Sequence, residues 1–198
     1  MEPYNLAFAF VAALLAGFVN AIAGGGTLIS FPVLIAIGIP PVAANITNTI
    51  ALCPGYFGGF IAQRKDLIPQ KQRLLKILPV SILGGIAGGL LLLNTSENSF
   101  RNLIPYLILL AAMLLALQPV LKKSVETRLQ KSARHKSKNA LMLLVIFIAA
   151  IYGGYFGAGL GVILLATLGL LIDDSLVKLN ALKQVISLRH CNEITCLF

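Results

Sequence analysis

Long apolar runs with few charged residues are the feature that most limits how this chain can fold. Of its 198 residues, 58% are hydrophobic and 12% are charged. A soluble domain carries about 25% charged residues, so this chain has roughly half of the usual solvating surface. A globule of this size could not bury so much apolar side chain, and lipid must therefore be part of the solvent.

Several apolar runs are close in length to the roughly 20 residues that a membrane-spanning helix needs. The first is about 34 residues long, which is too long for one upright crossing and short for two. The runs cover residues 5–38, 41–63, 74–93, 103–121, 140–156 and 162–172, and another begins at 176. Strands of a membrane β-barrel would alternate apolar and polar residues, whereas these runs are apolar on every face. The sequence therefore predicts an all-α polytopic membrane protein, with one helix over 41–63 and another over 176–188.

Basic residues are concentrated in two gaps between these runs, and their placement matters more than the formal net charge of +9. Five lie in residues 64–76 and seven in 122–138, together 12 of the 16 Lys and Arg. Short loops rich in Lys and Arg stay on the cytoplasmic side, so both are expected to be cytoplasmic loops. No aromatic interleaving or nucleic-acid-binding fold accompanies them, and we expect no nucleic-acid partner.

A glycine triplet, Gly24, Gly25 and Gly26, divides the first run into residues 5–23 and 27–37. A hairpin at the triplet places Met1 outside the cell, whereas a kink in one tilted helix places it inside; we favour the hairpin. Non-helical backbone at membrane depth is tolerated only where protein or a watery cavity satisfies its polar groups. A helix that begins at Thr27 would present free N–H groups and a positive dipole end, which attract anions. Close helix packing by small residues is the alternative, and both remain open.

A shift of 135 residues pairs the two halves of the chain. It aligns three pairs of residues: Gly24 with Gly159, Gly26 with Gly161, and Asn45 with Asn180. Each half has an apolar run, a glycine-rich break, a shorter run, a turn, and a helix with an early Asn. This order predicts duplication, and with the hairpin the repeats are inverted, as in many secondary transporters. Chance similarity of glycine-rich apolar sequence is the alternative.

The second break contains Gly157, Gly159 and Gly161 and precedes a helix that begins near Val162. Repeat symmetry would bring this helix N-terminus to the first one and form an anion site between them. The predicted architecture is therefore an inverted-repeat helical bundle in which a glycine-rich segment interrupts the helices of each half.

Polar side chains extend this candidate site. Asn45, Thr47 and Asn48 lie in the helix over 41–63. Amides and hydroxyls replace part of an anion's hydration shell; the alternative is hydrogen bonding between helices, worth about 0.6 kcal/mol each. Asn45 could also lie at the membrane interface. Asn20, just before the first break, is a weaker candidate.

The matching helix of the second half carries Asn180, Lys183 and Gln184. An ionisable residue within a membrane helix is a functional hypothesis by default. Lys183 would neutralise an anionic substrate or join a proton relay. The alternative is that its side chain extends to the interface.

The cysteine spacing and the absence of catalytic motifs give no indication of an enzyme. The spacing of Cys53, Cys191 and Cys196 suits neither a zinc site nor a disulfide framework, and Cys53 is interpreted as a small packing residue. The chain has no HExxH, GxSxG or P-loop motif. We therefore expect no catalytic activity, metal or cofactor.

The stretch GFVNAIAGGGTLISFPVLIAIGIPPVAANITNTIALCPG, residues 17–55, resembles the TauE/SafE family of membrane permeases, known as sulfite exporters. The block GGYFGAGLGVILLATLGL and the later LNALKQVISL resemble its second repeat. The resemblance implies a multi-pass inner-membrane transporter of sulfite, sulfonates or related organic anions, coupled to an ion gradient. It implies these site residues: Gly24, Gly25, Gly26, Asn45, Thr47, Asn48, Gly157, Gly159, Gly161, Asn180 and Gln184.

The tail departs from this resemblance, because after Leu188 the chain reads RHCNEITCLF and ends. We expect a truncation or frameshift product with an incomplete second repeat. The expected organisation is a first membrane repeat (1–121), a basic cytoplasmic loop (122–138), a partial second repeat (139–188) and an atypical tail (189–198).

The expected function is secondary transport of small anions, with activity of this chain alone in doubt. The alternative is a non-transporting membrane fragment or a subunit that packs on other helices. The expected partners are the lipid bilayer and the small anion, with a homo-oligomer left open.

Overall fold

The computed structural model describes residues 3–131, 135–172 and 174–197, and these residues form helices joined by short connections. None of the described residues is in a strand, which confirms the predicted all-α class. Along the chain the elements are α1 (Pro3–Ala23), α2 (Thr27–Ala36), α3 (Pro41–Ala51), α4 (Cys53–Ala62), α5 (Arg64–Leu67), the 3₁₀ turn η1 (Ile68–Gln70), α6 (Lys71–Leu93), α7 (Glu97–Lys131), α8 (His135–Tyr155), α9 (Leu160–Leu171) and α10 (Leu176–Leu197).

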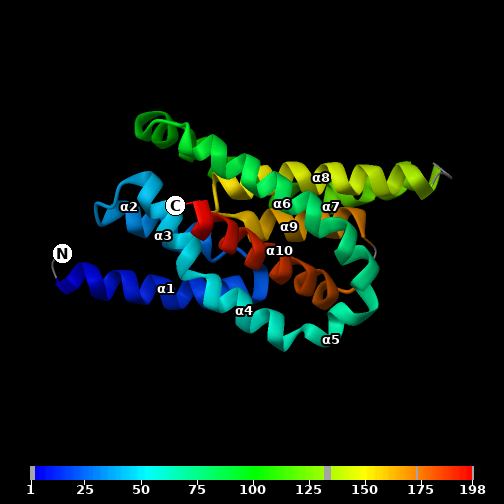
Figure 1. Cartoon of the computed structure of the whole chain (residues 1–198), viewed down its shortest axis with the longest axis horizontal. Coiled ribbons are helices and arrows are strands. Elements are labelled where there is room, and N and C mark those ends of the chain that lie inside the picture. Colours follow the sequence, from blue (N-terminus) through cyan, green and yellow to red (C-terminus); the bar gives the residue numbers. More distant parts are fainter. Residues whose placement is uncertain (1–2, 132–134, 173, 198) are drawn as a thin grey trace.

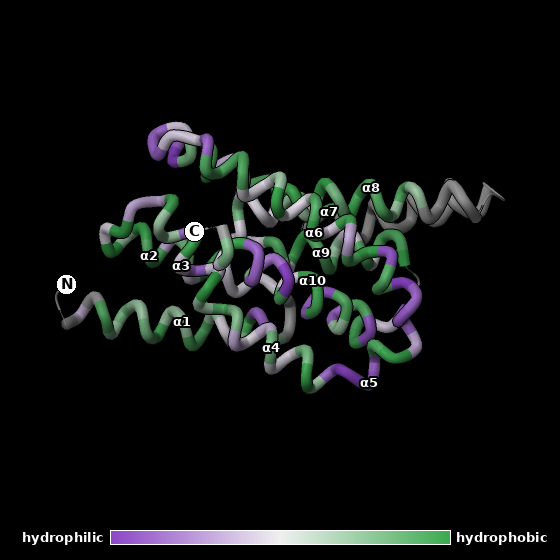
Figure 2. The backbone as a smooth tube through the Cα atoms, in the orientation of Figure 1, coloured by the Kyte–Doolittle hydropathy of each residue, from purple (hydrophilic) through white to green (hydrophobic). Residues whose placement is uncertain are grey.

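The surface of the bundle is suited to lipid. Large apolar side chains are exposed along α1, including Phe8, Phe10 and Phe18. Within the described part of the chain, one continuous helical segment, Arg64–Leu93, is long enough and contains a stretch apolar enough to cross a membrane. Shorter apolar helices include Thr27–Ala36 and Leu160–Leu171. Figure 2 shows that α1 is largely hydrophobic, whereas hydrophilic residues gather on α5.

Helix α9 lies at the centre of the bundle. It is apolar around its whole circumference, as expected for a helix that contacts other helices on all sides. It packs against α7, α8 and α10, and also meets α1. Its Leu164 and Leu168 form one core with Leu182 and Ile186 of α10. The second glycine break, which immediately precedes α9, is therefore buried in the middle of the molecule (Figure 1).

The chain reverses direction at the first glycine break, as the hairpin interpretation predicts. Helix α2 packs against α1, and Gly26 lies directly against the carbonyl oxygen of Ala16 on α1. A side chain at Gly26 would overlap this carbonyl group. The triplet therefore forms the tight connection of a helical hairpin.

The prediction of one helix over residues 41–63 is wrong. The structure contains two helices, α3 and α4, with Leu52 between them. Pro54, the second residue of α4, supplies the reason. Its ring removes a backbone N–H and crowds the carbonyl of the residue four positions earlier, so a continuous helix is disfavoured.

The two basic segments are more helical than loops. Residues 64–76 form α5, η1 and the first turns of α6, and α7 continues to Lys131 while α8 begins at His135. Lys and Arg are good helix formers, which accounts for these extensions. Residues 132–134 within the second segment lie outside the described residues.

The tail continues α10 rather than forming a separate segment. The helix predicted to end at 188 extends to Leu197 and buries Cys191 and Ile194. Cys191 is paired in a disulfide with Cys53 of α4, and their Cα atoms are 5.9 Å apart. The interpretation of Cys53 as a simple packing residue is therefore wrong, because α10 brings a partner from 138 positions away.

Candidate functional site

The two glycine breaks touch each other through their backbones. Gly24 and Gly159, which the 135-residue shift aligns, both have left-handed backbone conformations, with φ of 77° and 88°. A Cβ atom on Gly24 would lie 2.8 Å from the carbonyl carbon of Gly161. Both the positive φ and this close approach require glycine at position 24. Gly25 is less constrained, with only the Val162 side chain near its Cβ position.

The amide groups of the second break are bound by side chains from the first half of the chain. The Gly157 N–H donates to Asn45 Oδ1 at 3.0 Å, and the Gly159 N–H donates to Thr27 Oγ1 at 2.7 Å. Asn45 also donates through Nδ2 to the carbonyl oxygen of Tyr155 at 3.2 Å. All of these bonds are buried or partly buried. The second break is thus internally satisfied by protein groups.

The end of α1, just before the first break, is held by side chains from the second half. Lys183 Nζ donates to the carbonyl oxygen of Asn20 at 3.1 Å, and Asn180 Nδ2 lies 3.5 Å from that of Ala21. Asn180 also donates to Gln63 Oε1 at 3.3 Å. The Asn-bearing helix of each half therefore contacts the carbonyl groups that precede the other half's glycine break.

A group of buried polar side chains surrounds this second contact, and we call it the α10 polar cluster: Asn20, Tyr56, Asn180, Lys183, Gln184 and Ser187. Lys183 is 0% exposed. Four buried atoms in the cluster have no hydrogen-bond partner: Asn20 Oδ1, Asn180 Oδ1, Gln184 Oε1 and Ser187 Oγ. The hydroxyl of Tyr56 lies beside Asn20 and Ser187.

The charge of Lys183 has no counter-charge in this surrounding. Within the described residues, the ion pairs join Arg73 and Lys178 to Asp174, and none involves Lys183. An isolated buried charge is expensive unless it is paired or hydrogen-bonded. A protonated Lys183 would therefore need a partner that the described residues do not supply as an ion pair.

The structure separates the sequence-predicted residues into two groups. Thr27, Gly24, Gly159 and Gly161 lie at the contact between the breaks, and Asn45 binds Gly157 beside it. Gly25 lies near Val162, whereas Gly26 packs against Ala16 of α1. Asn180, Lys183 and Gln184 belong to the α10 polar cluster. Asn48 is buried and donates to the Thr27 carbonyl oxygen at 3.4 Å. Thr47 is exposed and belongs to neither group.

Sequence reasoning missed Tyr56 and Ser187 of the cluster, and also Gly59, which borders it. Ser187 is four positions after Lys183, so helical spacing alone would have placed both on one face. Tyr56 gave no such signal. Gly59 of α4 provides space for Gln184, whose side-chain amide lies against the glycine. Among the described residues there is no group of three or more His, Cys, Asp or Glu that could hold a metal ion.

A bundle of apolar helices, with broken helices meeting at its centre beside a buried polar cluster, is the architecture of a polytopic membrane transporter. The family described as Sulfite exporter TauE/SafE matches residues 9–188. This chain belongs to the TauE/SafE family, which confirms the resemblance found in the sequence.

Curated relatives of this chain are named as probable membrane transporter proteins. A protein of Escherichia coli strain K12, named "Probable membrane transporter protein YfcA", is 28% identical over 165 residues, which are 81% of this chain and 58% of that protein. "Probable membrane transporter protein ORF9" of a Sinorhizobium species is 30% identical over 79% of this chain and 58% of its own length. A "Probable membrane transporter protein" of Haemophilus influenzae is 30% identical over 92% of this chain and 69% of its own.

The chain therefore spans less than two thirds of the length of the first two relatives. No solved structure matches it.

Proposed function

We propose that this chain forms part of a secondary transporter of small anions, such as sulfite, sulfonates or related organic anions, in the inner membrane. The anion binds at the α10 polar cluster, with Lys183 as the charge that receives it. Both basic segments, 64–76 and 122–138, face the cytoplasm.

The observation that carries this proposal is the buried, uncompensated ammonium group of Lys183. Its hydrogen-bond partner among the described residues is a neutral carbonyl oxygen, which leaves two of its three N–H donors for a ligand. Helix geometry places Lys183 about 10 Å along α10 from Leu176, within the thickness of a bilayer. An anion at this position would remove the cost of an isolated charge.

The neutral groups of the cluster suit an oxyanion that must also be released. The hydroxyls of Ser187 and Tyr56 are donors to substrate oxygens, and the side chains of Asn20 and Gln184 offer amide groups. Partnerless buried oxygens accept hydrogen bonds from water bound with the anion. A site with one full charge and several neutral dipoles binds more weakly than one built from several cations.

The reciprocal contacts between halves support the further proposal of an internal inverted duplication. Asn45 reaches the carbonyl of Tyr155, and its aligned partner Asn180 reaches that of Ala21. In transporters of this type one repeat rocks against the other around a fixed site. Such a movement would change the contacts between α10 and the end of α1, where Lys183 lies.

One observation favours the alternative of a non-transporting fragment or packing subunit. The amides of Gly157 and Gly159 already donate to protein side chains, and Gly24 packs tightly on Gly161. This part of the molecule needs no ligand. The alternative differs from the main proposal in predicting no anion binding at the α10 polar cluster.

Binding of ³⁵S-sulfite to the purified full chain tests the proposal, with unlabelled sulfonates as competitors. In Lys183→Met we expect at least a tenfold loss of affinity and no loss of thermal stability, because the variant removes an unpaired buried charge while keeping the volume. The matched control, Lys71→Met, changes an exposed lysine of α6 and keeps binding.

Unchanged sulfite binding in Lys183→Met, or a large loss of stability with no selective loss of binding, would contradict the proposed role. Failure of the unaltered chain to bind any small oxyanion would favour the non-transporting alternative.

A further inference from the structure

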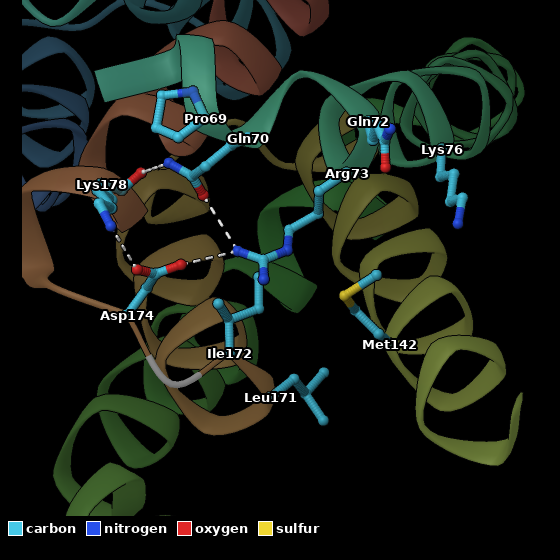
Figure 3. A pocket seen from close by; sticks show the side chains of 10 residues that line it. All are labelled: Pro69, Gln70, Gln72, Arg73, Lys76, Met142, Leu171, Ile172, Asp174 and Lys178. Atoms are coloured by element: carbon cyan, nitrogen blue, oxygen red, sulfur yellow. Dashed lines mark hydrogen bonds and ion pairs between the residues drawn. The ribbon is translucent and has the colours of Figure 1, made fainter. Parts of the chain in front are cut away.

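A cavity of about 520 Å³ opens away from the α10 polar cluster, where the beginning of α6 meets α8 and the connection between α9 and α10. Its lining includes Gln70, Arg73, Lys76, Met142, Asp174 and Lys178 (Figure 3). We call it the Arg73 pocket. The proposed transport function makes no use of it.

Cationic groups outnumber carboxylates among the described residues of this pocket. Asp174 accepts from Arg73 Nη1 at 2.9 Å and from Lys178 Nζ at 3.0 Å. These hydrogen bonds lower the pKa of the Asp174 carboxyl, which keeps it ionised. Lys76, also on the lining, has no ion-pair partner in the described part of the chain.

Arg73 retains donors for a ligand. Its Nη1 atom is shared between Asp174 and Gln70 Oε1, the latter at 3.2 Å, while the guanidinium group carries five N–H donors in all. Figure 3 shows the Arg73 side chain at the middle of the pocket, between Gln70 and Asp174. The planar fork of donors on Arg73, with the exposed Lys76 on the same lining, is suited to an oxyanion of the phosphate type.

Part of the remaining lining is apolar, while Gln72 adds a polar side chain. Met142, Leu171 and Ile172 contribute apolar groups, and the pocket sits where α6 begins, α9 ends and α10 begins. A pocket with basic groups and an apolar wall at the end of membrane helices matches the two parts of a phospholipid, its charged headgroup and its acyl chains. Basic pockets between membrane helices are known to hold anionic headgroups.

We propose that the Arg73 pocket binds a phosphate-type anion carried by the headgroup of an anionic phospholipid. The phosphate contacts Arg73 and Lys76, and Lys178 adds charge at the other side. Binding there holds the start of α6 to the segment that leads into α10, the helix that carries Lys183. The proposal does not depend on the transported substrate.

Native mass spectrometry of the full chain, exchanged into detergent with defined lipids, tests this site. We expect dioleoylphosphatidylglycerol to remain bound to the unaltered chain at least tenfold more strongly than dioleoylphosphatidylcholine. Lys76→Gln, which breaks no ion pair among the described residues, is expected to lose most of this preference, and Arg73→Gln all of it. Lys71→Gln, an exposed lysine on the same helix but outside the lining, is the matched control.

A second arm offers inorganic phosphate without anionic lipid and follows the melting temperature. Protection by phosphate that Lys76→Gln removes, without lipid retention, supports the anion site and excludes the lipid as its source. Equal retention of the two lipids with no phosphate effect overturns the proposal. Equal loss in Lys76→Gln and Lys71→Gln also overturns it, because the attraction would then be a general surface effect.

Discussion

The two glycine breaks have related sequences and backbone conformations, yet their polar surroundings differ. At the second break, the amides of Gly157 and Gly159 are bound by Asn45 and Thr27. Beside the first break, the α10 polar cluster contains a fully buried lysine and four buried polar atoms without partners. The polar groups of the second break are hydrogen-bonded within the protein, whereas those beside the first break still lack partners that a ligand could supply.

This difference follows the residues that the 135-residue shift pairs in the two halves. The alignment places Lys183 opposite Asn48 and Gln184 opposite Thr49, so the second half carries the charged and longer side chains. In the first half, Asn48 and Thr49 bond locally, to the carbonyl oxygens of Thr27 and Asn45. We therefore assign structure to the second break and ligand binding to the region beside the first.

The largest expected effect is on folding and comes from Gly24. Gly24→Ala places a Cβ against the Gly161 backbone at a positive φ, and we expect the protein to be lost from the monodisperse fraction in detergent gel filtration. Gly38→Ala is the matched control, since Gly38 also has a positive φ but open space around it. Its cost should be about 1–2 kcal/mol, from backbone conformation alone. Equal behaviour of the two variants would show that the breaks are not in tight contact.

Asn45 and Asn180 give the sharpest contrast between the breaks. Asn45→Leu leaves the Gly157 N–H and the Tyr155 carbonyl without partners, at about 1–3 kcal/mol for each buried group. Asn180→Leu removes two longer bonds, to the Ala21 carbonyl oxygen and to Gln63 Oε1, together with a partnerless oxygen, so its effect on stability should be smaller. Thermal unfolding in detergent measures both.

Anion binding should follow the opposite order. Asn180→Leu is expected to weaken sulfite binding severalfold, whereas any Asn45→Leu protein that still folds should bind almost normally. The reverse pattern would move the ligand site to the second break.

The smallest expected effect is the pH dependence from Asp174. Hydrogen bonds from Arg73 and Lys178 lower its pKa below the ordinary value of 3.8. The ionised carboxylate therefore stabilises the fold at neutral pH, and this contribution is lost as pH falls through the lowered pKa. Partly exposed ion pairs are worth about 1 kcal/mol or less.

Asp174→Asn should therefore lower the melting temperature slightly at pH 7, and the difference from the unaltered chain should shrink once the pH falls below 3.8 and disappear below the lowered pKa. Melting curves across this range measure it. A constant difference at all pH values would show that the substitution acts through packing rather than charge.

Local sequence patterns predicted the helices well where apolar length, glycine or proline determines where a helix begins and ends. The length of the apolar run predicted a helix over residues 74–93, and in the structure α6 begins just three residues earlier, at Lys71. Consecutive glycines predicted the break after Ala23, because no other residue type accepts φ of 77° at Gly24 so readily. The break at Leu52 also had a local signal, Pro54, but the continuous apolar run around it favoured the interpretation as one helix.

Contacts between distant segments could not be predicted in the same way. The bond from Asn45 to Gly157 spans 112 positions, and the one from Lys183 to Asn20 spans 163. A single sequence shows which polar residues are present but does not show which of them are hydrogen-bonded to each other. The same limit hid the pairing of Cys53 with Cys191 and the position of Tyr56 in the cluster.

The most direct test of the central claim is the location of a bound oxyanion. Crystals of the full chain grown with selenite, a heavier analogue of sulfite, would show it by anomalous scattering from selenium. We predict a peak within hydrogen-bonding distance of Lys183 Nζ, bordered by Gln184 and Ser187. A peak at the amides of Gly157 and Gly159 instead, or none near Lys183 while the crystals contain bound selenite elsewhere, would contradict it.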